Sequence, residues 1–164
     1  MNKSQLKGYL FRFTIIHTII YIITGLLFQN YLNYDPQFTS SVLYNNFRDV
    51  NSLIIRFAPI LQIIRGVFIG LIIYPVYGSI IQSKYSWLKL FALLWGLTLI
   101  GAVAATPGSI EGFIYTKIPF IEHLISLPEV TLQTFLFSIL FIYWDKKVIK
   151  RKKEIFDKVD KESD

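Results

Sequence analysis

The sequence has 164 residues and contains no cysteine. This absence excludes disulfide bonds, thiolate metal sites and cysteine nucleophiles, and it leaves the redox compartment undetermined. Charged residues are also scarce, at 17% of the chain against about 25% in an average soluble domain. Because 53% of the residues are hydrophobic and they cluster in long runs, we expect a lipid-embedded chain with no room for a separate soluble domain.

The common catalytic and metal-binding motifs are missing as well. The chain has no HExxH, no GxGxxG, no P-loop lysine motif and no GxSxG around a serine. His123 follows Glu122, but adjacent helical residues point about 100° apart, and the other histidine, His17, is expected near the opposite face of the membrane. We therefore predict no metal and no cofactor.

Four apolar runs predict an all-α integral membrane protein, folded as a four-transmembrane-helix bundle. The expected helices cover residues 9–28, 57–82, 87–105 and 128–144. The second run is roughly 39 Å long as a helix, enough to cross a bilayer core of about 30 Å with some tilt. We divide the chain into a transmembrane domain, residues 1–145, and a basic cytoplasmic tail, residues 146–164.

The connections between the runs differ in character. Residues 29–53 are polar, and they hold either a short surface helix over residues 41–47 or an ordinary loop. Residues 82–86 predict a tight turn. Residues 106–128 are too interrupted by proline and glycine to cross the bilayer but too apolar for a solvated loop, which favours an interfacial or re-entrant segment. Arg12 is expected to extend outward from an uncleaved first helix.

The distribution of positive charge predicts the orientation. With both termini in the cytoplasm, 13 lysines and arginines lie on the cytoplasmic side and 3 lie outside, while Arg65 lies within the membrane. Cytoplasmic loops carry the excess of positive charge in membrane proteins, so we predict a multi-pass protein of the cell membrane with cytoplasmic N- and C-termini.

Arg65 is the only charged residue in the second run, about 12 Å from its start. An ionisable side chain at this depth faces protein or a wet cavity and is a candidate functional residue. We predict an outward-facing polar pocket in which Arg65 pairs with a carboxylate, first of all that of Glu129. The residues expected in this ligand-binding pocket are Arg65, Gln62, Arg56, Glu129, Gln133, Glu111 and His123.

These residues leave several functions open. The pocket could bind a small molecule, a lipid headgroup or a partner protein, which we favour over an enzyme. A membrane enzyme for lipid or lipid-linked substrates would use Glu111, Glu122, His123 or Glu129 as acid or base. A structural subunit of a membrane complex would hold Arg65 in an internal ion pair that fixes helix register and binds nothing.

The expected partners are membrane components. The basic tail after Trp144 can attract anionic headgroups, or it can dock a cytoplasmic protein. Gly66 and Gly70 form a GxxxG motif, which lets helices approach closely, either within this chain or in a homodimer or with a partner membrane protein. The density of positive charge is highest in the tail, where it can set the topology and meet anionic lipid, so we expect no nucleic-acid partner.

Overall fold

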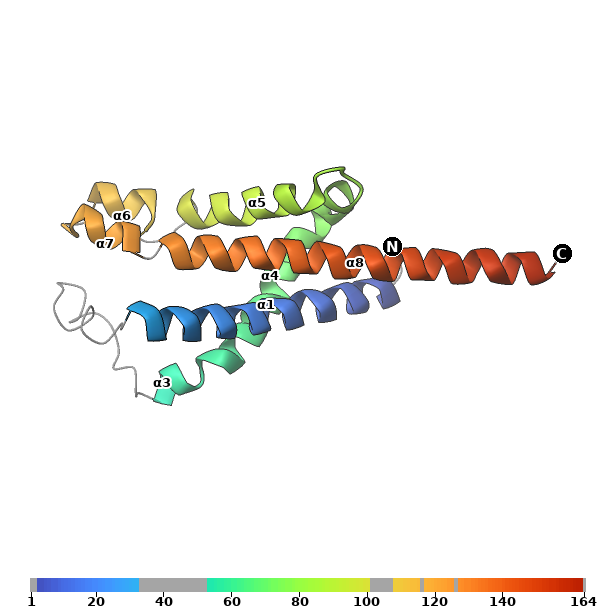
Figure 1. Ribbon diagram of the computed structural model, residues 1–164, viewed down its shortest axis with the longest axis horizontal. Coiled ribbons are helices and arrows are strands. Elements are labelled where there is room, and N and C mark those ends of the chain that lie inside the picture. The colour runs from blue at the N-terminus through green and yellow to red at the C-terminus, as the bar shows by residue number, and fades with distance from the viewer. Residues whose placement is uncertain (1–2, 33–52, 101–107, 116, 126, 164) are drawn as a thin grey trace.

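The computed structural model describes residues 3–32, 53–100, 108–115, 117–125 and 127–163, and every regular element in these ranges is a helix. The all-helical class predicted from the sequence is confirmed. The helices are α1 Lys3–Leu32, α3 Leu53–Arg56, α4 Ala58–Ile81, α5 Ser86–Ile100, α6 Ile110–Tyr115, α7 Phe120–Ile125 and α8 Leu127–Ser163 (Figure 1). The short helix expected over residues 41–47 and the end of the third predicted helix, residues 101–105, lie outside the described residues.

Three helices of the described chain are long and apolar enough to cross a membrane. The qualifying spans are Gln5–Phe28, Ala58–Ile81 and Leu127–Lys158. Helix α5 is also apolar but has 15 residues, so it is about 22 Å long and shorter than a bilayer core of about 30 Å. Large hydrophobic side chains such as Phe68 and Ile72 are more than 60% exposed on these helices, as expected for surfaces that contact lipid.

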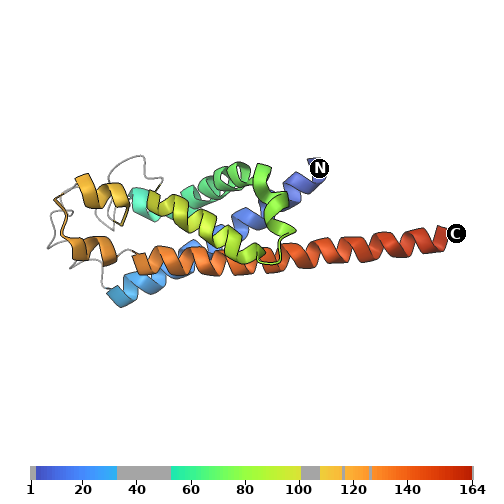
Figure 2. The ribbon, with the colours of Figure 1, turned by 90° about the horizontal axis from the view of Figure 1, so that it is seen from above.

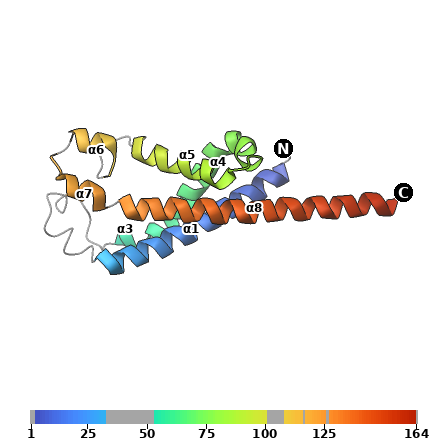
Figure 3. The ribbon, with the colours of Figure 1, turned by 45° about the horizontal axis from the view of Figure 1, so that its top comes forward.

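Helix α8 runs along the long axis of the molecule, with α1 packed on one side and α5 on the other (Figures 1 and 3). Helix α4 packs mainly against α1 and joins α5 through the tight turn at residues 82–85. The N-terminus and this turn lie at one end of the bundle, and α3, α6 and α7 lie at the other end (Figure 1). The C-terminal part of α8 extends beyond the other helices (Figure 2).

Aromatic side chains form the core where α1, α4 and α8 meet. Tyr9 and Phe13 of α1 are at most 1% exposed, as is Phe141 of α8. The ring centroids of Tyr9 and Tyr77 are 4.6 Å apart, and those of Phe13 and Phe137 are 4.7 Å apart, within the range of favourable aromatic pairs. This core ties the three helices together in the half of the bundle nearer the N-terminus.

Helix α4 approaches α1 closely through Gly66 and Gly70. A Cβ added to Gly66 would lie 3.2 Å from the Cα of Thr14, so a backbone atom occupies the space that a side chain would need. At Gly70 the hydroxyl of Tyr9 donates a hydrogen bond to the backbone carbonyl at 3.1 Å. The glycine surface is therefore covered by α1 of the same chain, and a homodimer through it would have to displace α1.

Two helices extend further than the apolar runs indicate. Helix α1 begins at Lys3 rather than near residue 9, and α8 continues from Leu127 through the basic tail to Ser163. A polar helix can continue past the apolar part because exposed lysine and glutamate are good helix formers, and Lys150 pairs with Glu154 one turn later.

Candidate functional site

A cavity of about 270 Å³ lies between α1, α4, α5 and α8, in the half of the bundle nearer α6 and α7. Phe13 and Phe137 of the aromatic core close its inner side. Ile69 and Leu94 add further apolar surface. The polar side chains that line the cavity are His17 and Tyr21 from α1, Arg65 from α4, Thr98 from α5, and Glu129, Gln133 and Thr134 from α8.

The spacing of residues along α8 explains which of its side chains line the cavity. Glu129 and Gln133 are four residues apart, and Val130, Thr134 and Phe137 complete the same side of the helix. Glu129 lies in the first turn of α8, where the positive end of the helix dipole favours a carboxylate. The carboxylate and the amide therefore enter the cavity from one helix, opposite the guanidinium of α4.

Arg65 lines this cavity and is exposed. The sequence predicts that this side chain faces either protein or a wet cavity, and a guanidinium that keeps an open side can exchange hydrogen bonds with water or a ligand. Its charge lies close enough to His17 for a direct electrostatic interaction. Arg65 and Glu129 line the same space, and a direct ion pair between them stays a prediction.

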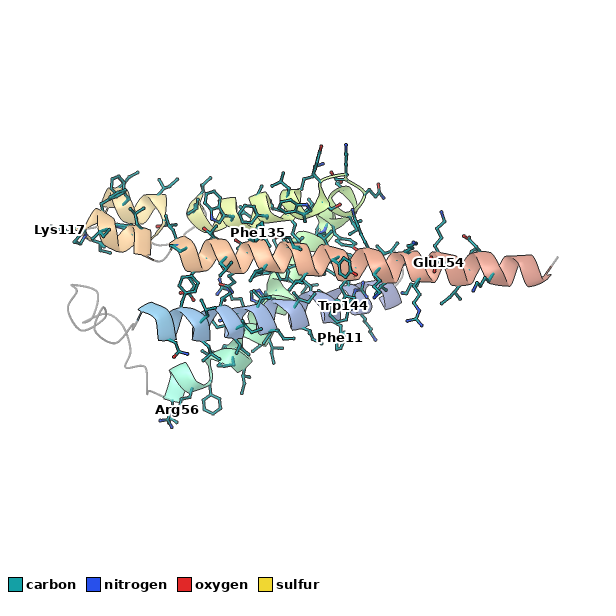
Figure 4. All side chains as sticks on the ribbon, in the orientation of Figure 1. Phe11, Arg56, Lys117, Phe135, Trp144 and Glu154 are labelled. Carbon is teal, nitrogen blue, oxygen red and sulfur yellow. The ribbon has the colours of Figure 1, made fainter. Side chains whose placement is uncertain are left out.

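The other predicted site residues are placed differently. Gln62 is buried one turn before Arg65. Arg56 ends α3 and is exposed at the edge of the molecule, away from the cavity lining (Figure 4). The side chain of Glu111 lies outside the described part.

His123 is also absent from the cavity lining. It is 4% exposed in α7, and its Nδ1 accepts a hydrogen bond from the backbone N–H of Gly108 at 3.1 Å. Gly108 has a φ of 82°, a left-handed conformation that glycine adopts without strain. The Phe113 ring lies edge-on to the imidazole, with centroids 6.0 Å apart. His123 thus fixes the turn before α6 instead of facing Arg65.

The sequence-based prediction missed four polar residues of the cavity: His17, Tyr21, Thr98 and Thr134. His17 lies near the middle of α1, a helix of 30 residues. The signal was present: His17 and Tyr21 are four residues apart in an apolar run, which places two polar groups on one face.

Four buried polar atoms belong to α1 and α4, and one of them, His17 Nε2, is on a residue that lines the cavity. Within the described residues, Thr14 Oγ1, His17 Nε2, Thr18 Oγ1 and Gln62 Oε1 have no hydrogen-bond partner. Buried polar groups are normally hydrogen-bonded, to protein or to ordered water. We therefore expect ordered water near these atoms and, at His17, water or a polar ligand atom in the cavity.

A second polar site, an ion pair, joins α1 and α8 at the opposite end of the bundle. Arg12 forms an ion pair with Asp145, and its Nε donates a hydrogen bond to the same carboxylate oxygen. The Asp145 side chain is completely buried, and that of Arg12 is 14% exposed. The outward-extended Arg12 expected from the sequence is therefore wrong, and a carboxylate in the basic block holds it inside.

The described residues contain no group of three or more histidine, cysteine, aspartate or glutamate side chains placed to hold a metal ion. Comparisons with protein-family models, curated proteins and solved structures gave no match. The class that fold and site define is thus an all-helical protein with three potential membrane spans and a polar cavity between them.

Proposed function

We propose that this protein resides in the cell membrane, crosses it four times with α1, α4, α5 and α8, and keeps both termini in the cytoplasm. The N-terminus, the turn at residues 82–85 and the basic part of α8 lie at one end of the bundle, which supports a common side for these segments (Figure 1). The Nζ of Lys146 lies 3.5 Å from the carbonyl of Ser83, which supports the same grouping. A complete third crossing needs residues after Ile100, where the sequence stays apolar to Ala105.

We further propose that the cavity around Arg65 opens outward and binds a small anionic molecule or the anionic headgroup of a lipid. The observation that carries this proposal is the exposed guanidinium in a cavity lined by polar groups of four helices. A guanidinium matches the geometry of a carboxylate or phosphate, and Ile69 and Leu94 would contact an apolar part of the same ligand. A volume of about 270 Å³ is slightly below the range of about 300–1,000 Å³ for drug-sized ligands, which favours a small molecule or a headgroup.

The two other functions have less support. Of the residues that the enzyme hypothesis uses, Glu129 and Arg65 line the cavity, but His123 and Arg56 do not, so a single carboxylate would have to act there without the histidine. A structural subunit needs an Arg65 sealed in a dry ion pair, whereas Arg65 is exposed.

The proposal is tested by ligand-induced stabilisation of the protein in phosphatidylcholine nanodiscs. Three probes carry the same anionic chemistry in different forms: inorganic phosphate, hexanoate and dihexanoyl phosphatidate. A ligand at one hundred times its Kd stabilises the folded state by about 2.7 kcal/mol, which raises the unfolding temperature measurably. We expect at least one probe to do so.

Arg56→Gln is the matched control, because it removes an arginine near the same end of α4 but outside the cavity. We expect Arg65→Gln to lose the stabilisation and Arg56→Gln to keep it. The proposal is wrong if no probe stabilises the protein, or if Arg65→Gln responds as the unchanged protein does.

A further inference from the structure

A groove of about 460 Å³ runs between α1 and α8, and none of its lining residues lines the cavity around Arg65. On α1 its wall consists of three isoleucines, Ile16, Ile19 and Ile20. On α8 the wall changes in character along the helix, from Leu140 through Tyr143 and Trp144 to Lys147 and Arg151. Trp144 belongs to the stretch of α8 that runs beside α1 (Figure 4).

The α8 residues that line the groove recur every three or four positions and therefore share one face of the helix. Leu140 and Arg151 are eleven residues apart, about 16 Å along the helix axis. Over this distance the wall passes from aliphatic to aromatic to basic, the order in which a phospholipid passes from acyl chain to headgroup. Tryptophan and tyrosine favour the level between the two.

The two basic side chains at one end of the groove, Lys147 and Arg151, can bind an anion. Asp145, the nearest carboxylate in sequence, is completely buried against Arg12, and Glu154 pairs with Lys150. Within the described residues neither Lys147 nor Arg151 takes part in an ion pair. Both are exposed, and their aliphatic stems can cover the groove while the charged groups reach the headgroup level.

From this arrangement we infer that the groove binds one anionic phospholipid, with an acyl chain along the isoleucines of α1 and the phosphate at Lys147 and Arg151. Charge complementarity selects this occupant. A second copy of the chain would bring the same two positive charges to the groove, and a zwitterionic lipid would leave them without a net counter-charge. The site shares no residue with the cavity around Arg65 and does not depend on that proposal.

The inference is tested by quenching of Trp144 fluorescence. Trp87→Phe and Trp95→Phe leave Trp144 as the single tryptophan, and circular dichroism checks that the helices persist. The protein is placed in phosphatidylcholine vesicles that contain either brominated phosphatidylglycerol or brominated phosphatidylcholine, whose bromine atoms quench a nearby tryptophan. We expect the anionic lipid to bind more tightly at Trp144, by about fivefold for each of the two basic side chains.

Two pairs of substitutions separate the groove from general attraction to the tail. Lys147→Gln with Arg151→Gln should abolish the preference for the anionic lipid. Lys152→Gln with Lys153→Gln removes the same charge from exposed positions of α8 outside the groove and should leave most of the preference. An equal loss in both pairs would mean diffuse attraction and overturn the inference. Equal quenching by both lipids, or weak quenching by either because a second copy fills the groove, would also overturn it.

Discussion

Arg12 and Arg65 both lie in long apolar helices, and each needs polar contacts in place of the water that lipid excludes. Arg12 obtains them from the buried carboxylate of Asp145. Arg65 remains exposed and lines a cavity with Glu129 and Gln133. We therefore interpret the first arginine as a structural connection between α1 and α8, and the second as an anchor for a ligand.

The Arg12–Asp145 pair predicts a large loss of stability when one partner is removed. Replacing Arg12 by Gln leaves the carboxylate of Asp145 buried without a counter-charge, and such a change typically costs about 3–5 kcal/mol. Asp145→Asn should cost a similar amount, and the double variant should lose clearly less than the sum. The free energies of unfolding of the two single variants and the double variant are measured by titrating the purified proteins with dodecyl sulfate in mixed micelles.

The exposed pair of Lys150 and Glu154, with side chains 81% and 60% exposed, supplies the control. Lys150→Gln and Glu154→Gln should each lower the free energy of unfolding by less than about 1 kcal/mol. Additive effects at Arg12 and Asp145 would show that the two side chains do not stabilise each other.

Sequence patterns predicted the cavity residues better than the ion pair. Arg65, Glu129 and Gln133 were predicted together because each is polar and lies at the outer part of its helix, and the structure places all three in one cavity. Asp145 is the last residue of the predicted transmembrane domain and is followed directly by lysines, and the sequence predicts no partner for it in the bundle. The sequence cannot show which face of α8 turns toward α1, and that face decides whether Asp145 meets water or Arg12.

At the scale of elements, the contact between α1 and α4 depends on small residues. Gly66 and Gly70 let the two backbones approach, whereas a Cβ at Gly78 would meet no atom within 4 Å. The row of glycines is visible in the sequence, but its partner is not. The structure shows that α1 covers the first two glycines and leaves the third open.

Gly66→Leu and Gly78→Leu make a matched pair in the same helix. Gly66→Leu must push α4 away from the backbone of Thr14, and overpacking of this kind typically costs about 1–3 kcal/mol. Gly78→Leu should be tolerated, because its side chain enters open space. Their thermal unfolding temperatures in detergent check this difference, and equal values for both variants would contradict close packing at Gly66.

Apolar runs in the sequence do not predict where α1 and α8 begin and end. A run of hydrophobic residues marks the part of a helix that lipid can cover, but α1 and α8 continue into charged segments that water can solvate. His17 lies near the middle of the predicted helix over residues 9–28 and also near the middle of α1. The packing of α1 against α4 and α8, and not the length of the helix, brings His17 to the cavity.

At the scale of the whole molecule, the proposed orientation predicts which residues a membrane-impermeant reagent can reach. The natural chain lacks cysteine, so single-cysteine variants need no background correction. In intact cells a charged maleimide should label Lys117→Cys, between α6 and α7, and should not label Lys153→Cys on the basic part of α8. Permeabilised cells should allow labelling of both. The reverse pattern in intact cells would invert the topology and move the cavity to the cytoplasmic side.

The central claim is that Arg65 serves a ligand and does not hold the fold together. The free energy of unfolding of Arg65→Gln, measured without ligand in phosphatidylcholine nanodiscs, tests this claim most directly. An exposed guanidinium contributes little to stability, so we expect a loss below about 1 kcal/mol, as for exposed ion pairs. A loss of about 3–5 kcal/mol, the cost of breaking a buried pair, would contradict the account and make Arg65 a structural residue.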